Sequence, residues 1–198
     1  MSRAWPVAGV DPSTPLDVNA RRILAVRIAE FYSYAPAVAI EAASEPLHDL
    51  RIAAKRLRYT LELFRAVFGE TGERLIERIK AVQEELGEIH DHDVRIALIE
   101  NELQGLAAAQ AAAVGRALAA AAATEHAAIV ATAMRPPPDD PRRGLIALLG
   151  RQHASRRQHY QAFVAIWDRF MGEGMRADLV GLSATPVEIT ASLDADRA

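Results

Sequence analysis

The chain has 198 residues, of which 51% are hydrophobic and 25% charged, and its formal net charge is −3. This length suffices for one domain with a hydrophobic core, the lack of cysteine excludes disulfides and thiolate metal sites, and the net charge gives no sign of a polyanion partner. Because no stretch reaches the roughly 20 uninterrupted apolar residues of a membrane span, and the first residues lack the apolar core of a signal peptide, we expect a cytoplasmic protein without a membrane partner.

Helical periodicity runs through most of the sequence, and no window shows the alternation that is typical of a β-strand. We expect residues 1–15 to form a loose leader. Residues 16–43 carry apolar side chains on one helical face, and Pro36 should kink or split this helix because proline lacks a backbone donor. A second helix is predicted over residues 45–68, where Gly69 supplies a usual C-terminal glycine.

A third helix is predicted after Gly72, with apolar residues that recur at helical spacing. Residues 88–103 either continue this helix with a kink or form a new helix that Asp91 or Asp93 caps. Both alternatives keep the segment helical.

The C-terminal half begins with an Ala-rich stretch, which has a high helix propensity but buries little area. Together with the prolines that follow Arg135, it forms an insertion at about residues 105–141. The last helix is predicted over residues 142–171. Residues 173–198 are expected to be a flexible tail, apart from a weak turn or two near residues 176–182. Helix-only periodicity with short connections predicts an all-α fold, an antiparallel helical bundle over residues 16–172.

The segment LHDLRIAAKRLRYTLELF, residues 47–64, carries positive side chains along one face of its predicted helix. They recur at spacings of i, i+3, i+7 and i+10 and are His48, Arg51, Lys55 and Arg58. Like charges at such spacings repel one another, and a solvated charged face without a ligand is the alternative to a binding surface. Because arginine presents a planar fork that matches phosphate oxygens, we expect this face to bind an anion, with phosphate as the natural ligand.

Positive residues also fall on predicted apolar faces. On a helical wheel of the last helix, Arg156 shares the inner face with Gln152 and His159. The cations that flank this face are Arg151 and Arg157. Arg27 falls in the same way within the apolar stripe of the first helix. These positions predict polar contacts inside the bundle.

A cation on an inner face needs a partner, because burying an isolated charge costs several kcal/mol or more. The partner is either an acidic side chain of the third helix or an external anion in a groove where the basic helices converge. The acidic candidates are Asp91, Asp93, Glu84 and Glu88. Because cations outnumber acids on the second and last helices, we expect one concave basic wall, with the Glu-rich surface of residues 70–102 facing elsewhere.

The tetrapeptide HDHD, residues 90–93, raises the alternative of a metal-dependent phosphohydrolase that uses His48, His90 and acidic neighbours. Neighbouring residues of a helix point about 100° apart, so His90 and His92 diverge, and no His-x-x-x-His spacing places two ligands on one face. No recognisable nucleophile setting or Gly-rich nucleotide loop is present. We therefore predict no metal site, no cofactor and no enzymatic activity.

A further alternative is a basic face that docks nucleic acid or an acidic protein. Non-specific binding to DNA needs only basic side chains against phosphates, whereas recognition of single strands uses aromatic platforms. The basic stripes offer only Tyr59 and Tyr160. We therefore rank a bare phosphate chain above RNA or DNA.

Two sequence motifs, taken together, point to a protein family more specifically than either motif does alone. Residues 47–64, with LGEIHDHDV at residues 86–94, resemble the CHAD family, the conserved-histidine α-helical domains. The family's pattern has a His, an Arg three residues later, a basic pair, Leu and Arg, which correspond here to His48, Arg51, Lys55, Arg56, Leu57 and Arg58. The resemblance covers roughly residues 16–171.

The resemblance implies a helical bundle whose basic surface binds inorganic polyphosphate without catalysis, and a location at polyphosphate granules. By motif match, the polyphosphate-binding role falls on His48, Arg51, Lys55, Arg56 and Arg58. The helical-wheel argument adds Arg27, Arg151, Arg156 and Arg157. Many members hold two bundle halves with a motif each, whereas this sequence has one good copy. We therefore expect a four-helix-type half of that architecture, which could form a homodimer to extend the basic surface.

Overall fold

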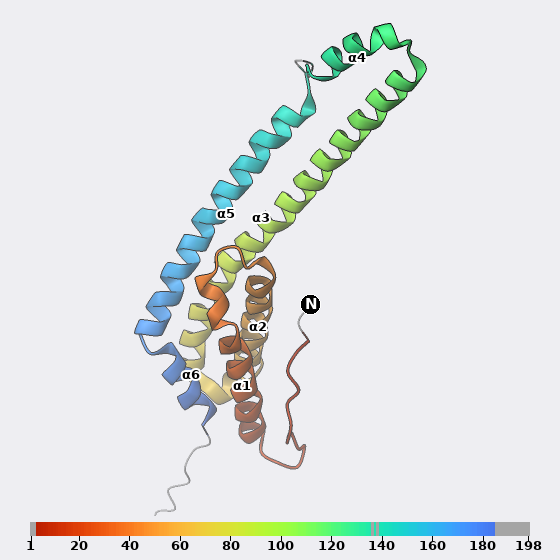
Figure 1. Cartoon of the computed structure of the whole chain (residues 1–198). Coiled ribbons are helices and arrows are strands. Elements are labelled where there is room, and N and C mark those ends of the chain that lie inside the picture. The colour runs from red at the N-terminus through yellow and green to blue at the C-terminus, as the bar shows by residue number, and fades with distance from the viewer. Residues whose placement is uncertain (1–2, 136, 138, 185–198) are drawn as a thin grey trace, which may run out of the picture. The chain divides into compact units, whose positions relative to one another are not determined.

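The computed structural model describes residues 3–135, 137 and 139–184. These residues are mostly helical and contain no β-strand (Figure 1), which confirms the predicted all-α helical fold. The helices are α1 (Leu16–Ser33), η1 (Ala35–Ala39), α2 (Ser44–Leu63), α3 (Arg65–Ala120), η2 (Ala123–Glu125), α4 (His126–Ala133), α5 (Pro141–Gly172) and α6 (Met175–Ser183). None of the described helices is both long and apolar enough to cross a membrane.

The chain divides into two compact units, each of which is described by itself. The first unit comprises residues up to 84 and residues from 164 onwards, and the second comprises residues 85–163. Helices α3 and α5 each contribute residues to both units, so the boundary between the units falls within these two helices and not in a linker.

The core of the first unit forms where α1 packs against α2 and α6. Helical spacing puts Leu24 and Phe31 on the inner face of α1, and both are almost completely buried. Trp167 of α5 meets Phe31 with a distance of 5.4 Å between ring centroids. The α2 residues buried in this unit are Leu47, Leu50, Ala53, Ala54, Leu57, Thr60 and Leu61. Each fully buried large apolar side chain contributes roughly 1.5–3 kcal/mol, so this face fixes the orientation of α2.

The predicted helix boundaries need correction around Gly69. Helix α2 ends at Leu63 and not at residue 68, because the backbone of Phe64 leaves the helical region with φ −103° and ψ 28°. The chain resumes a helical path at Arg65, and Gly69 then interrupts α3 with φ 55° and ψ −149°. Only glycine adopts this conformation without strain, so Gly69 does mark a helix break, as the sequence indicates.

Helix α3 continues without a break through residues 88–103. The alternative of a new helix capped by Asp91 or Asp93 is therefore wrong. Asp93 instead faces α5, where it pairs with Arg156.

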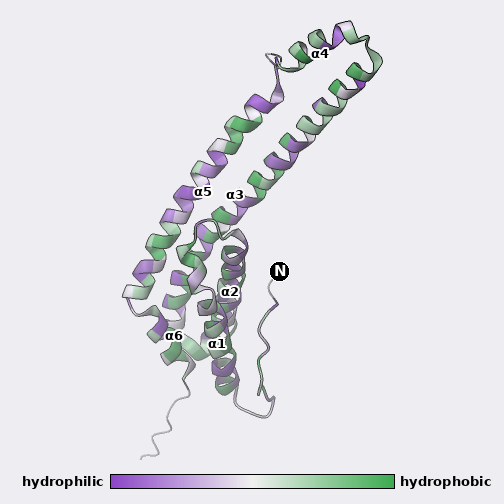
Figure 2. Cartoon of the chain, in the orientation of Figure 1, coloured by the Kyte–Doolittle hydropathy of each residue, from purple (hydrophilic) through white to green (hydrophobic). Residues whose placement is uncertain are grey.

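In the second unit, α3 after residue 85 and α5 before residue 163 run antiparallel and are joined through α4 (Figure 1). The Arg142 guanidinium donates to Gln110 near the α4 end, and the Arg156 guanidinium donates to Asp93 further along. The Ala-rich segment continues α3 to Ala120. Figure 2 shows α4 as mostly hydrophobic, yet no described residue between positions 100 and 139 is buried. Helix propensity therefore contributes more to the stability of the helices in this segment than apolar burial does.

Both ends of the described chain are more ordered than predicted. In the leader, Arg22 Nη1 donates to the Gly9 carbonyl oxygen at 2.6 Å. Part of the predicted flexible tail is helix α6, whose Met175 and Leu179 are fully buried. Arg21 Nη1 also donates to the Leu182 carbonyl oxygen at 2.6 Å. The remainder of the predicted tail, residues 185–198, lies outside the described residues.

Candidate functional site

Helix α2 presents the positive face that its spacing predicts. We call His48, Arg51, Lys55 and Arg58 the α2 basic stripe. Lys55 is exposed and the other three are half-buried. At a rise of about 1.5 Å per residue, the stripe extends for about 15 Å along the helix. The buried leucines of α2 face the core of the first unit and leave the stripe on the adjacent, partly exposed side of the helix.

An aromatic ring lies beside two cations of the stripe. The Arg58 guanidinium carbon is 4.9 Å from the centroid of the Tyr59 ring, and Lys55 Nζ is 5.6 Å from it. These distances are within the range of a cation–π attraction. Arg58 Nη1 also donates to Glu62 Oε1 at 3.2 Å, whereas Arg58 Nε has no hydrogen-bond partner among the described residues. Tyr59 therefore helps to hold two positive side chains close together.

The positive charge of the stripe is only partly neutralised inside the protein. Arg58 pairs with Glu62, and this pair is the single ion pair that the described residues provide for the three permanent cations of the stripe. Arg51 and Lys55 form no ion pair with any described residue. Two cations of the stripe can therefore contact an external anion without giving up an internal carboxylate.

Two other predicted binding residues have an internal acidic partner. The Glu30 side chain of α1 is completely buried, and Arg56 Nη1 donates to its Oε1 at 2.5 Å. Arg27 Nη1 donates to Glu30 Oε2, and Arg27 Nη2 donates to the Trp5 carbonyl oxygen at 2.8 Å. Because two guanidinium groups share one carboxylate, this cluster keeps a formal charge of +1. Both arginines thus have a structural role, and their contact with a ligand stays a prediction.

The α5 arginines lie in the second unit. Arg156 is buried, and its Nε donates to Asp93 Oδ1 at 2.5 Å, so the internal partner predicted for it exists. Arg151 and Arg157 are exposed. The convergence of these arginines with the α2 basic stripe in one groove stays a prediction.

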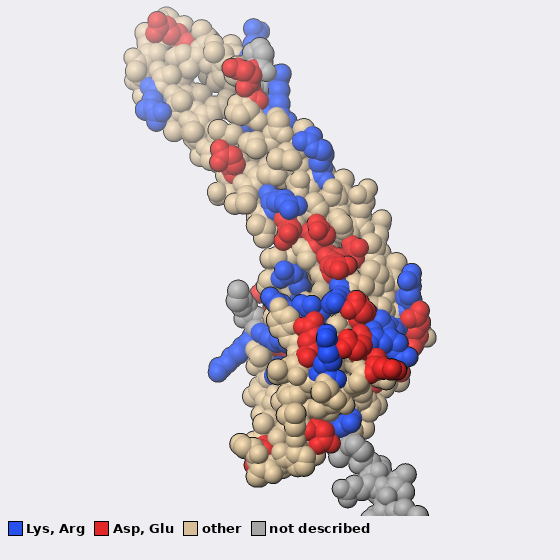
Figure 3. Space-filling model, turned by 180° about the vertical axis from the view of Figure 1, so that it is seen from behind, with Lys and Arg blue, Asp and Glu red and all other residues tan. Residues whose placement is uncertain are grey.

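Charges of both signs are mixed on the surface seen in Figure 3. Lysine and arginine side chains are interspersed with aspartate and glutamate side chains on this face. The predicted wall of a single sign is therefore not present on this face. A mixed surface keeps the long-range potential weak, so anion binding depends on local contacts such as those of the α2 basic stripe.

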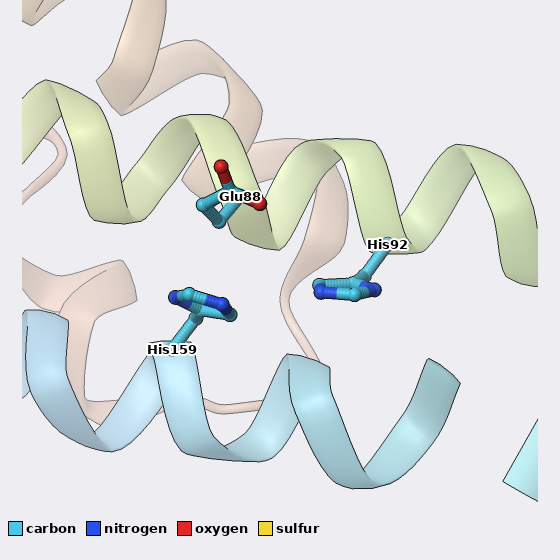
Figure 4. A group of neighbouring side chains, drawn as sticks. All are labelled: Glu88, His92 and His159. Carbon is cyan, nitrogen blue, oxygen red and sulfur yellow. The ribbon is translucent and has the colours of Figure 1, made fainter. Parts of the chain in front are cut away.

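A second group of polar side chains lies where the sequence analysis did not predict a site. Glu88 and His92 of α3 face His159 of α5 (Figure 4). The signal in the sequence was the i, i+4 spacing of Glu88 and His92, together with the inward position of His159 on the helical wheel. His90 diverges from His92 around the helix and is not part of this group.

Comparison with known families assigns part of the chain to one of them. The model of the CHAD domain matches residues 3–100. Through these residues, the chain belongs to the CHAD family. The CHAD match contains the leader, α1, η1, α2 and the first part of α3. No curated protein and no solved structure shows significant similarity to the chain.

The limits of the CHAD match separate the predicted binding residues into two groups. The α2 basic stripe, Arg27 and Arg56 lie within it, whereas Arg151, Arg156 and Arg157 lie beyond its end at residue 100. The match therefore begins before the predicted residue 16 and ends well before residue 171. The predicted α2 residues thus lie inside the part of the chain that the CHAD match covers, and the binding role of both groups stays a prediction.

Proposed function

We propose that the CHAD domain of this chain binds inorganic polyphosphate through the α2 basic stripe, without catalysing a reaction. The observation that carries this proposal is the pair Arg51 and Lys55, which lie on one face of α2 and have no carboxylate partner among the described residues. A polyphosphate chain offers a row of anionic oxygens that can satisfy several such cations at once. Charge-assisted hydrogen bonds from arginine to phosphate are among the strongest available at a surface.

The internal ion pairs of these residues suggest an order of importance within the proposed site. Arg51 and Lys55 can bind a phosphate without breaking an ion pair, and Arg58 must share its guanidinium with Glu62. Arg27 and Arg56 would have to leave buried Glu30, which is costly. We therefore expect Arg51 and Lys55 to contribute more to polyphosphate affinity than Arg27 and Arg56 do.

Charge reversal in the stripe tests the proposal. In the full chain, Arg51→Glu combined with Lys55→Glu should lower the affinity for long-chain polyphosphate at least about tenfold, which corresponds to about 1.4 kcal/mol. Each lost phosphate contact should also make the plot of log K against log salt less steep. For nucleic-acid phosphates, the magnitude of the slope falls by on the order of 0.7–0.9 per contact. Arg74→Glu is a matched control for Arg51→Glu, because Arg74 is exposed on α3 in the same unit.

Binding isotherms at several salt concentrations give both quantities, and circular dichroism checks the helical content of each variant. If the double variant binds polyphosphate as tightly as the unmodified chain at equal salt, the α2 basic stripe is not the site. Competition distinguishes polyphosphate from nucleic acid. Duplex DNA whose molecules carry the same charge as the polyphosphate chain, added in molar excess, should fail to displace polyphosphate. Displacement would instead favour a general polyanion-binding surface.

A further inference from the structure

The cluster of Glu88, His92 and His159 is separate from the α2 basic stripe and lies entirely in the second unit. One potential ligand atom from each side chain lies within 4.8 Å of the other two. Figure 4 shows Glu88 and His92 on α3 and His159 on α5, with the two imidazole rings in the space between the two helices. His92 is buried, His159 is half-buried and Glu88 is exposed, so the cluster is accessible from one side.

Both imidazole rings are oriented by an oxygen atom. His92 Nδ1 is 2.7 Å from Gln152 Oε1, and His159 Nδ1 is 2.8 Å from Glu85 Oε2. An amide carbonyl oxygen and an ionised carboxylate only accept hydrogen bonds, so each Nδ1 must be the donor. In a neutral ring, the lone pair then lies on Nε2. Metal-binding histidines have this arrangement, because an outer carboxylate or carbonyl group fixes the tautomer and the orientation of the ring.

The Nε2 atoms and the Glu88 carboxylate are not engaged elsewhere. His92 and His159 form no hydrogen bond through Nε2 with any described residue, and Glu88 forms no ion pair with one. The buried cation that precedes His159 by three residues, Arg156, is bound to Asp93. Glu85 and Glu88 give the immediate surroundings negative charge, which favours a cation over a phosphate as the occupant.

We propose that Glu88, His92 and His159 bind one first-row divalent cation of the zinc class. Two imidazoles with one carboxylate form a donor set that zinc uses with an open position for water, whereas Mg²⁺ and Ca²⁺ prefer oxygen ligands alone. Ligand atoms of a tetrahedral zinc ion lie about 3.4 Å apart, as bonds of about 2.1 Å require. Small side-chain rotations would bring the three atoms to that separation, and exposed Glu88 is free to make them.

Titration of the untagged, metal-free full chain with Zn²⁺ tests this site. Isothermal calorimetry should detect one Zn²⁺ per chain with a dissociation constant in the micromolar range or tighter, and Co²⁺ should develop the visible absorption of a low-coordinate site. His159→Ala and Glu88→Gln should each weaken Zn²⁺ binding at least about tenfold. Loss of the outer partner through Gln152→Ala should weaken it about 10–100-fold.

His153→Ala is the matched control, because His153 is exposed on the same helix and lies outside the cluster. This variant should bind Zn²⁺ like the unmodified chain. Circular dichroism of each metal-free variant separates lost binding from lost folding, and Glu88→Gln is informative in any case because Glu88 is exposed. Absence of stoichiometric binding below about 100 μM Zn²⁺ would overturn the site, as would unchanged affinity in Glu88→Gln or in His159→Ala. Polyphosphate affinity should be the same in Glu88→Gln, so the outcome is independent of the function proposed for α2.

Discussion

Arg156 and Asp93 form a largely buried ion pair that joins α5 to α3 in the second unit. Arg156 Nε lies 2.5 Å from Asp93 Oδ1, and the two side chains are 9% and 21% exposed. The pair accounts for a cation on the inner face of α5, where the polar side chains of Gln152 and His159 also lie. Within this unit the pair is thus a structural element, whatever else Arg156 contacts.

Removing one partner of this pair should be costly. Asp93→Asn removes the carboxylate that pairs with the buried Arg156 guanidinium, and we expect a loss of about 2–3 kcal/mol in the free energy of unfolding. Denaturant unfolding measures this loss. Glu62→Gln is the control, because it removes the more exposed Arg58–Glu62 pair and should cost at most about 0.5 kcal/mol. Equal effects of the two substitutions would contradict the structural role of Asp93.

The shared carboxylate of Glu30 gives a second prediction. Glu30→Gln leaves both Arg27 and Arg56 without their buried acidic partner, and we expect it to lower the free energy of unfolding by about 3 kcal/mol. Polyphosphate affinity of the folded variant, measured below its unfolding transition, should not fall, because no cation is lost. A weaker affinity in a fully folded Glu30→Gln chain would show that the arrangement of Arg27 and Arg56 matters for binding.

Tyr32 should make stability fall at alkaline pH. It lines a cleft of about 520 Å³ between α1 and α6, and burial raises the pKa of Tyr32 to about 12, against the opposing charges of Arg176 and Arg78. In the unfolded chain a tyrosine ionises near pH 10. Between about pH 10 and pH 12 the unfolded state therefore binds fewer protons, and the free energy of unfolding falls as the pH rises.

Because the ring is partly exposed, we expect the free energy of unfolding to decrease by only on the order of 1–2 kcal/mol over this pH range. Tyr32→Phe should remove it. Comparing the tyrosinate absorbance of the two proteins should give a difference signal that develops near pH 12. A difference signal centred near pH 10 would show that the Tyr32 hydroxyl is not protected in solution.

Two glycines of α3 should respond to alanine in opposite directions. Gly69 has φ 55° and ψ −149°, a conformation that costs a residue with a Cβ about 1–3 kcal/mol. Gly105 is helical and exposed, and no atom lies within 4 Å of an added Cβ. Gly105→Ala should thus raise the free energy of unfolding by up to about 1 kcal/mol, whereas Gly69→Ala should lower it. Thermal and denaturant unfolding can measure both, and the same sign for both would contradict the break at Gly69.

Periodicity predicted most of the fold because it reports which side of a helix is buried. It identified the inner faces of α2 and α5 and part of that of α1, and it placed Arg27 and Arg156 among apolar residues. It did not identify Glu30 as the partner of Arg56, because that contact depends on how α1 and α2 pack and not on spacing within either helix. It indicated only a weak turn or two where α6 lies, and it missed that the i, i+4 spacing of Met175 and Leu179 forms a short buried face.

The candidate binding residues were also predictable to different degrees, because spacing reports which residues share a face of one helix and not which helices pack together. The α2 basic stripe lies on one helix, so its spacing alone was sufficient to place its members on one face. The cluster of Glu88, His92 and His159 combines two helices, and its members are far apart in the sequence. Only the packing of α3 against α5 brings them together.

The segment between positions 100 and 139 has a further consequence for the dynamics of the second unit. Since none of its described residues is buried, unwinding its helices would add little apolar surface to the solvent. Amide hydrogens there should exchange through small local openings whose rates hardly respond to denaturant, unlike those of the leucine-rich α2. The end of this helical pair near α4 is therefore also the place where inserted residues would disturb the rest of the protein least.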